Sequence, residues 1–402
     1  MMESLMKLAS QTAWLSTAFG AFTLCLCAAS STFAQTVTTP IASPQTPLAA
    51  NPSTHAPKVL IVVSSEGRNG GETRPGFEMD EYALAYLVFR ANGVRVEVAS
   101  PAGGPVEADK FNPKDDHIQA LLADEHATAL LRNTRRIADV KPGDHQAIFV
   151  MGGKGAMFDL PKDSSLISLL GAQFDRDGIV AAVCHGPAVF ANVRRADGRP
   201  LIAGKRVTGF TDEEEKTFGK KWVKEYPFLI ESKFREQGAI WEEAALMLPK
   251  TIVDDKLITG QNPFSTSETA EAIVRALGRT PAPRAVLKEE RSMRLVQRWL
   301  AGEKDQVRAI LAADAKEYKL DLIAMLGYYQ AEAAPDDAAK RAALSIMEMA
   351  VPYMQHPRLR LGMARTHIAL GNVKTAREIL TALIAEKPDF ADAKKALDAL
   401  PG

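Results

Sequence analysis

Short apolar runs alternate with longer amphipathic segments over residues 58–278. Three continuous apolar runs, at 59–63, 147–151 and 179–183, predict strands that are covered on both faces. Residues 94–98 form a fourth strand, and 75–92 place their apolar side chains on one side of a helix. Strands that alternate with helices predict an α/β domain with a mainly parallel, flavodoxin-like sheet. Its ligand crevice is expected at the carboxyl ends of the strands.

Residues 285–402 follow a different pattern, which is helical throughout. A hinge, Pro281-Ala282-Pro283, separates them from the α/β domain. One stretch carries small residues, a leucine and a proline at the spacing of a tetratricopeptide unit: Ala364, Gly371, Ala376, Leu380 and Pro388. Two interpretations stay open. The segment is either a helical-repeat module that binds a partner protein, or a helical cap on the α/β domain. The first implies that a chain ending near Leu277 folds by itself.

The N-terminal segment has the pattern of a secretory signal. Lys7 precedes an apolar, uncharged run from 13 to 29, and small residues lead to Ala34. We therefore expect residues 1–34 to be removed and 35–57, rich in proline and without charge, to form a linker. An uncleaved membrane anchor and a lipoprotein signal fit this run less well. The expected location is periplasmic or secreted.

Composition narrows the classes of function. Lysine plus arginine and aspartate plus glutamate both number 49, so no basic excess indicates nucleic acid. Beyond the signal, no apolar stretch is long enough to cross a membrane. The histidines apart from His185 show no metal-ligand spacing, so we expect no metal site. Cys25 and Cys27 lie in the signal, which leaves Cys184 as the one cysteine of the mature chain.

Cys184 ends the buried strand 179–183 and is followed by His185, Gly186 and a helix-compatible segment. This order predicts a nucleophile elbow with sulfur as the nucleophile. The helix that begins there should favour the thiolate, so that Cys184 reacts well below the usual thiol pKa. The competing interpretation is a small, inert, buried cysteine. His185 could act as a proton shuttle, or its ring could brace the elbow, and both neighbours could reach one substrate carbon without bonding each other. Its backbone N–H is a second candidate oxyanion donor.

Two further segments carry candidate site residues. The loop of Gly152, Gly153, Lys154 and Gly155 follows a strand, and its backbone N–H groups could hold an oxyanion. A phosphate loop is disfavoured because no Gly-Lys-Ser/Thr follows. Carboxylates occur in two clusters, at Glu78, Asp80 and Glu81 and at 212–215. Helix-dipole complement and solvation are expected to explain most of them, with at most one per cluster facing the sulfur and Glu78 on another face.

Four motifs in this order resemble the ThiJ/PfpI superfamily, with its class I glutamine amidotransferase-like fold. Within it the chain is most similar to the heat-shock-associated glyoxalase III proteins. The resemblance spans about 58–277 and is carried by 181–188, 197–205, 207–212 with Glu215 just after, and 259–263.

This resemblance implies roles for individual residues. Cys184 matches the nucleophile, His185 the adjoining histidine, and Glu215 the carboxylate that orients it. Glu81 matches the glutamate that contacts the sulfur, in the pattern from Gly76 to Glu81. Gly152 to Gly155 match the glycine loop, although Lys154 stands where those proteins carry a histidine.

The implied activity is the cofactor-independent conversion of a small 2-oxoaldehyde to a 2-hydroxy acid, as from methylglyoxal to lactate. The alternative is a non-enzymatic stress or chaperone-type binding protein whose helical tail recruits a partner. A glutamine amidotransferase is a weaker third, since no Cys…His-x-Glu arrangement follows the elbow. Whether two copies of the chain form a homodimer stays open.

If the signal is cleaved after Ala34, protein recovered from the periplasm or the medium should begin near Gln35. Intact-mass measurement reads this directly. Recovery of residues 1–34 in a membrane fraction would contradict the prediction.

Overall fold

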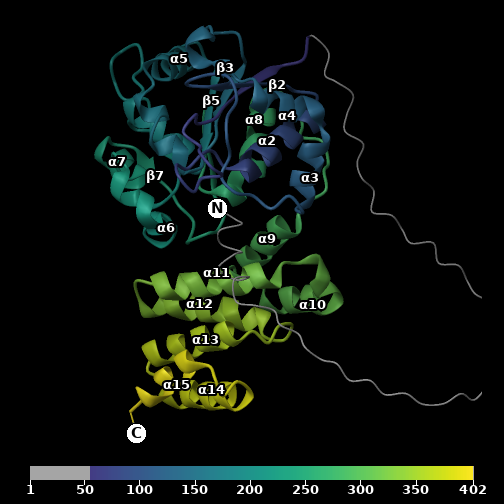
Figure 1. Ribbon diagram of the computed structural model, residues 1–402, viewed down its shortest axis with the longest axis vertical. Helices are drawn as coiled ribbons and strands as arrows, with labels where there is room; N and C mark the ends of the chain where they lie inside the picture. The colour runs from purple at the N-terminus through teal and green to yellow at the C-terminus, as the bar shows by residue number, and fades with distance from the viewer. Residues whose placement is uncertain (1–54, 402) are drawn as a thin grey trace, which may run out of the picture.

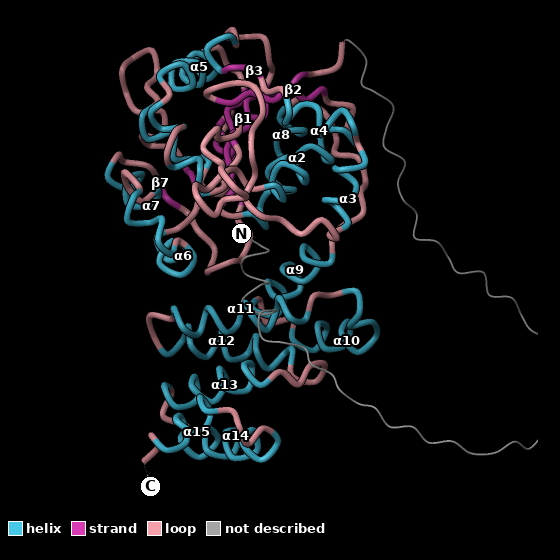
Figure 2. Tube along the Cα trace, in the orientation of Figure 1, coloured by secondary structure: helices cyan, strands magenta, loops and turns pink. Residues whose placement is uncertain are grey.

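The structure, a computed structural model, describes residues 55–401 (Figures 1 and 2). The expected signal, its cleavage site and most of the linker lie outside this range. Within it, an α/β body comes first and a stack of helices follows, as the colours of Figure 1 show. None of the described helices is long and apolar enough to cross a membrane.

The α/β body is built on a seven-stranded sheet. Its strands run in the order β3 (Arg135–Arg136), β2 (Arg95–Ser100), β1 (Lys58–Val62), β4 (Ala147–Val150), β5 (Ile179–Val183), β9 (Leu257–Gly260) and β8 (Thr251–Asp254). All neighbours are parallel except β8 and β9. The α/β class and the mainly parallel sheet are therefore confirmed. A separate two-stranded sheet pairs β6 (Arg206–Val207) with β7 (Ile240–Trp241).

Helices cover both faces of this sheet, which is why the central strands are apolar throughout. The α-helices of the body are α2 (Met79–Ala91), α3 (Asp116–Ala123), α4 (Glu125–Arg132), α5 (Ser164–Asp175), α6 (Asp212–Phe218), α7 (Ile230–Glu236) and α8 (Thr266–Ala276). Helices α2 and α8 pack together on one face, and α5 lies on the other (Figure 1). Every residue of 59–63 and 180–183 has no exposed surface. Burial of such runs is the main force that holds the layers together.

The parallel register brings two predicted segments to the same edge of the sheet. Val150 at the end of β4 pairs with Ala182 near the end of β5. The loop that begins at Met151 and the turn at Cys184 therefore leave the sheet side by side. The crevice predicted at the carboxyl ends of the strands is the place where these two turns meet.

The C-terminal helices form antiparallel pairs. They are α9 (Lys288–Leu300), α10 (Lys304–Asp314), α11 (Leu320–Ala333), α12 (Asp337–Ala350), α13 (Pro357–Ala369), α14 (Val373–Glu386) and α15 (Ala391–Asp398). The last three share a small apolar cluster of their own around Leu361, Leu380 and Leu383. Small residues at Ala364 and Ala376 are fully buried there. The prediction of a helical region after the hinge is confirmed.

The first helices of this region also pack on the α/β body. One apolar cluster runs without a break from the sheet through α9, α11 and α12. Phe218 of α6 meets Tyr329 of α11 edge-to-face, with ring centroids 5.2 Å apart. The neighbouring Gln330 donates its side-chain N–H to the carbonyl of Leu246 at 2.8 Å. Helices α9–α12 thus act as a cap, whereas α14 and α15 are repeat-like and contribute no residue to this cluster.

This division predicts different results for two truncations. A chain that ends at Gly371 loses only α14 and α15, so it should stay soluble and keep its activity. A chain that ends at Leu277 uncovers the apolar surface around Phe218 and Leu246. It should aggregate or unfold at a temperature at least ~5 °C lower. Thermal unfolding of both chains beside the full one is the measurement. Equal unfolding temperatures for the full chain and the chain ending at Leu277 would refute the cap.

Candidate active site

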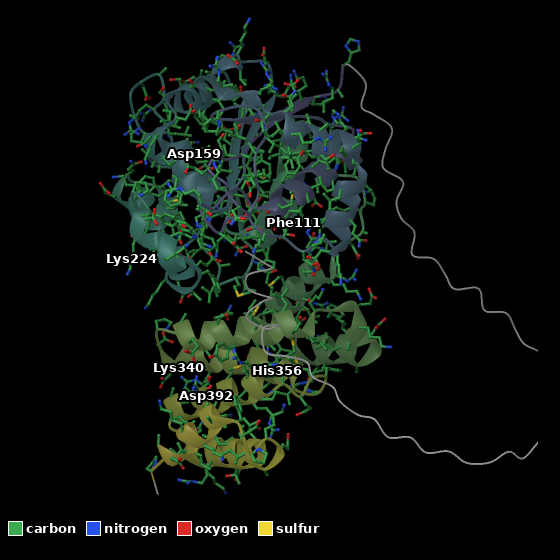
Figure 3. All side chains as sticks on the ribbon, viewed as in Figure 1. Phe111, Asp159, Lys224, Lys340, His356 and Asp392 are labelled. Carbon is green, nitrogen blue, oxygen red and sulfur yellow. The ribbon has the colours of Figure 1, made fainter. Side chains whose placement is uncertain are left out.

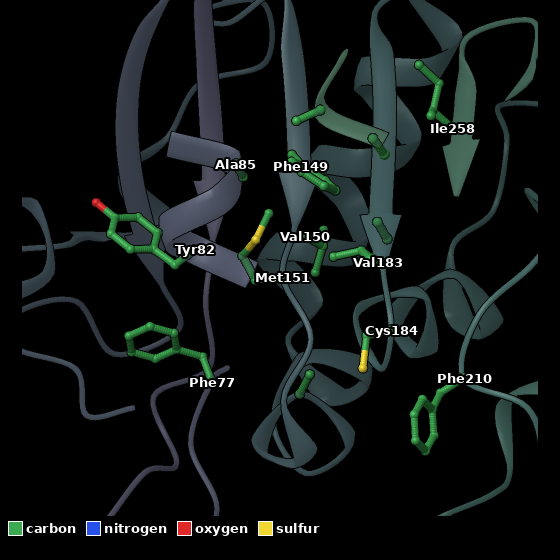
Figure 4. Packing of buried hydrophobic residues seen from close by; sticks show 14 of the residues in the cluster. Phe77, Tyr82, Ala85, Phe149, Val150, Met151, Val183, Cys184, Phe210 and Ile258 are labelled. Carbon is green, nitrogen blue, oxygen red and sulfur yellow. The ribbon is translucent and has the colours of Figure 1, made fainter. Parts of the chain in front are cut away.

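Cys184 occupies a strained turn at the end of β5. Its φ is +60°, in the left-handed region that residues other than glycine rarely adopt. A Cβ on Gly186 would lie 2.4 Å from the carbonyl oxygen of Val150, so only glycine lets the chain turn back so closely. This is the geometry of a nucleophile elbow. Figure 4 shows Cys184 where β5 ends, between α2 on one side and Phe210 on the other.

The helix expected after the elbow is shorter than predicted. Residues Gly186–Asn192 form a 3-10 helix, η4, in place of an α-helix. The stabilisation of a thiolate by an aligned α-helix is therefore weaker than the sequence suggested.

His185 contacts the sulfur directly. The distance from Cys184 Sγ to His185 Nδ1 is 3.3 Å, so the two neighbours are hydrogen-bonded to each other. On its other side, His185 Nε2 lies 2.8 Å from Glu215 Oε1. The ring is stacked on Phe210 at a centroid distance of 4.3 Å. Sulfur, imidazole and carboxylate thus form a continuous chain of contacts in which all three side chains are buried.

Glu81 reaches the same sulfur from the first turn of α2. Its Oε2 accepts the N–H of Gly152 at 2.6 Å, and a Cβ on Gly152 would lie 2.9 Å from that oxygen. A Cβ on Gly152 would lie 2.7 Å from the Cβ of Cys184, which explains a glycine at that position. The backbone N–H of Gly153 lowers the pKa of Cys184. One oxygen of Glu81, Oε1, is buried and has no protein partner among the described residues.

Burial controls the charge of this cluster. It raises the pKa of Glu81 well above its ordinary value, and the charge of Glu78 adds to the effect. Burial likewise raises the pKa of Cys184, and an ionised Glu81 would raise it further. Two negative charges cannot coexist at this distance in a buried site. The prediction of a thiolate formed well below the usual thiol pKa is therefore wrong: the sulfur needs a base, and His185 is in contact with it.

The acidic clusters are not solvated faces. Five of the seven side chains are buried: Glu78, Asp80, Glu81, Glu214 and Glu215. Asp80 pairs with the buried His117 at 2.6 Å. Glu214 connects the first turn of α6 to two distant segments. Its carboxylate accepts hydrogen bonds from Asn262 Nδ2 and from the Met247 N–H. These residues do lie at the starts of α2 and α6, as the helix-dipole interpretation expects, but solvation is wrong for the five buried ones. The sequence shows the face of a helix but not what packs over it.

Lys154 follows Gly152 and Gly153 in the glycine loop. It is half-buried at the start of a 3-10 helix, η2 (Lys154–Met157). Its charge acts on Asp109, whose pKa is raised by burial and held down in part by the Gly76 N–H and by Lys154. Of the glycine loop, Gly152 lies against Cys184, and the Gly153 N–H lowers the pKa of its sulfur. Residues 55–401 contain no cluster of three side chains suited to a metal ion.

Sequence reasoning missed Tyr226. It follows a 3-10 helix, η5 (Lys220–Glu225), in which Figure 3 labels Lys224. The Tyr226 ring lies 6.2 Å from that of His185 and 5.4 Å from that of Phe158. No local motif marks it, because it reaches the site through a fold contact some 40 residues beyond the elbow.

Comparison with known proteins agrees with this geometry. Residues 73–276 match the DJ-1/PfpI family, and residues 331–400 match a tetratricopeptide repeat family. The chain is 32% identical over 234 residues to Glyoxalase 3 of Candida albicans, covering 54% of this chain and 98% of that protein. It is 31% identical over 239 residues to a glutathione-independent glyoxalase of Saccharomyces cerevisiae, covering 55% and 98%.

A solved structure of similar fold is glyoxalase III from Candida albicans, at a TM-score of 0.50 and 29% identity, with 55% of this chain and 97% of that chain covered. Another is the rapid encystment protein of Francisella tularensis, at 0.51 and 29%, with 55% and 99% covered. The elbow, the buried site around Cys184 and these matches together show that the chain belongs to the DJ-1/PfpI family and carries a tetratricopeptide-like region after it.

Proposed function

We propose that this protein is a glutathione-independent glyoxalase of the glyoxalase III type. Its substrates would be small 2-oxoaldehydes such as methylglyoxal, and its products 2-hydroxy acids such as lactate. The observation that carries the proposal is the placement of one sulfur between the carboxyl group of Glu81 and the imidazole of His185. Relatives named as glyoxalases, at about a third identity over nearly their whole length, support it.

In the first step, His185 takes the proton of Cys184 and Glu215 stabilises the imidazolium that forms. The sulfur adds to the aldehyde carbon, C1. Glu81, which burial keeps protonated, gives its proton to the aldehyde oxygen, O1. The product is a hemithioacetal, and Glu81 is now a carboxylate. The Gly153 N–H beside the sulfur helps to hold the developing charge.

In the second step, hydrogen moves from C1 to the ketone carbon, C2. Glu81 removes the C1 proton, which places negative charge on the ketone oxygen, O2, and His185 protonates that oxygen. Glu81 then gives its proton to C2, while the proton on O1 passes to His185, which is protonated again. The result is a thioester of a 2-hydroxy acid on Cys184. This sequence needs one group that both gives and takes a proton, and a carboxyl group with a raised pKa suits that task.

In the third step, water attacks the thioester carbon and the C–S bond breaks. Glu81 accepts the remaining proton of the water, the 2-hydroxy acid leaves, and the sulfur recovers its proton from His185. Electrons and protons balance over the three steps without an external oxidant, reductant or cofactor. The reaction is an internal redox exchange between C1 and C2 with net addition of water.

A non-enzymatic binding protein is the second candidate. The complete burial of Cys184 and the tetratricopeptide-like helices favour it, because the latter often bind partner proteins. Loss of methylglyoxal with formation of lactate in the presence of the purified protein supports the enzyme. Absence of both leaves the binding function. For either candidate we propose export, which the pattern of residues 1–34 supports.

Substitutions at the site should separate chemistry from stability. Cys184→Ala should abolish turnover, since no other group forms the thioester. Glu81→Gln and Glu215→Gln should lower kcat by roughly 10²–10⁴-fold, the range for loss of a proton-transfer group or its partner. Glu213 lies on the same helix as Glu215 but is half-buried on another side. Its variant Glu213→Gln is the control and should retain wild-type turnover. Steady-state kinetics with methylglyoxal is the measurement. Wild-type turnover in Cys184→Ala would exclude the mechanism.

Glu78 should control the pH dependence, contrary to the expectation that it lies on another face. Burial raises its pKa to about 7, and its charge raises the pKa of both Glu81 and Cys184. Glu78→Gln removes that charge, so both pKa values should fall and alkylation of Cys184 by iodoacetamide should begin at lower pH. The control Glu213→Gln should leave the profile in place. A profile that stays or moves to higher pH in Glu78→Gln would show that Glu78 does not act on the sulfur.

A further inference from the structure

The phenol group of Tyr226 is buried and unused. Its oxygen is buried and has no hydrogen-bond partner among residues 55–401. Most buried hydroxyl groups are paired, since an unpaired one costs free energy. The ring itself is half-buried and held on two sides, by Phe158 and by His185. An unpaired donor next to a reactive imidazole indicates a place where a ligand atom completes the bond.

The segment that carries Tyr226 is held to the 66–76 loop by polar contacts. Glu225 forms an ion pair with Arg74 at 3.0 Å, and Lys221 donates to the carbonyl of Glu72. The guanidinium of Arg74 also lies 3.6 Å above the Phe158 ring, against which Tyr226 packs. These contacts join the 66–76 loop to the segment after α6. The Tyr226 side chain is therefore held in its orientation by groups that take no part in the proposed chemistry.

The surroundings keep this phenol protonated. Burial raises the pKa of Tyr226, and negative charge on Glu215 and Cys184 raises it further. A hydroxyl group in this state offers a proton for a hydrogen bond and does not compete as a nucleophile or base. The same charges show that Tyr226 lies within electrostatic reach of the sulfur and of the carboxylate behind His185.

We propose that Tyr226 binds the ketone oxygen, O2, of the 2-oxoaldehyde and stabilises the charge that develops there. This inference rests on the proposed function and names the group that recognises the second carbonyl of the substrate. Glu81 approaches the sulfur from α2 and the Gly152 side, where it can serve O1. Tyr226 approaches from the His185 side, which leaves it O2. The charge on O2 peaks when C1 loses its proton, so a donor placed there lowers the barrier of that step.

A purely structural role of Tyr226 predicts different experimental results. If Tyr226 only braced His185 or Glu215, loss of its hydroxyl would change the reactivity of the sulfur itself, since those groups act on Cys184. If it binds O2, the sulfur keeps its reactivity and only turnover of a substrate with that oxygen suffers. Removal of an unpaired buried hydroxyl should also leave the fold as stable as before, or more so.

The test uses the full chain with Tyr226→Phe, which keeps the ring and its packing. We expect kcat/KM for methylglyoxal to fall about 10²-fold, as for loss of one donor to a developing oxyanion. We expect an unchanged or higher unfolding temperature, and an unchanged pH profile for alkylation of Cys184 by iodoacetamide. Tyr86→Phe is the matched control, because its hydroxyl donates to Asp124 at 2.9 Å. It should lower the unfolding temperature and leave the kinetics unchanged.

Three results would overturn the inference. Wild-type kcat/KM in Tyr226→Phe would show that the hydroxyl binds no reacting atom. A loss of activity together with a shifted alkylation profile would assign Tyr226 to bracing of His185. A wild-type protein that leaves methylglyoxal intact would remove the proposed function and this inference with it, and the parallel wild-type assay makes that failure distinct from the first two.

Discussion

One buried sulfur atom sets the constraints for the whole α/β body. Cys184 sits in a left-handed turn that β5 can enter only because Gly186 and Gly152 leave room for it. Its charge can form only if a neighbour takes or lends a proton, since burial opposes ionisation. Glu81 and His185 meet that need from two different elements. The parallel sheet is what places those elements at one edge.

The carboxylate behind His185 depends on packing that extends into the C-terminal helices. Glu215 lies on α6, which begins with a capping box between Thr211 and Glu214. The other end of α6 carries Phe218, against which Tyr329 of α11 packs. The cap therefore packs on the same short helix that carries Glu215, the partner of the His185 imidazole. This gives a physical reason for joining helices α9–α12 to the α/β body.

Local patterns predicted the parts of the fold that local physics decides. The apolar runs of β1, β4 and β5 and the turn at Cys184 are features of consecutive residues, so they could be read directly. The charge state of the site could not, because Glu78 and Glu214 look solvated until the elements that cover them are known. Tyr226 stayed hidden for the same reason: its role depends on contacts with Phe158 and His185 that no sequence spacing reveals.

The central claim is that Glu81 holds a proton at neutral pH while the sulfur exchanges its own with His185. Infrared difference spectroscopy of the carbonyl stretch tests it most directly, by subtracting the spectrum of Glu81→Gln from that of the wild-type protein. The account predicts a protonated carboxyl band that belongs to Glu81. If the difference shows an ionised carboxylate instead, Glu81 is the base for Cys184 and the order of proton transfers described above is wrong.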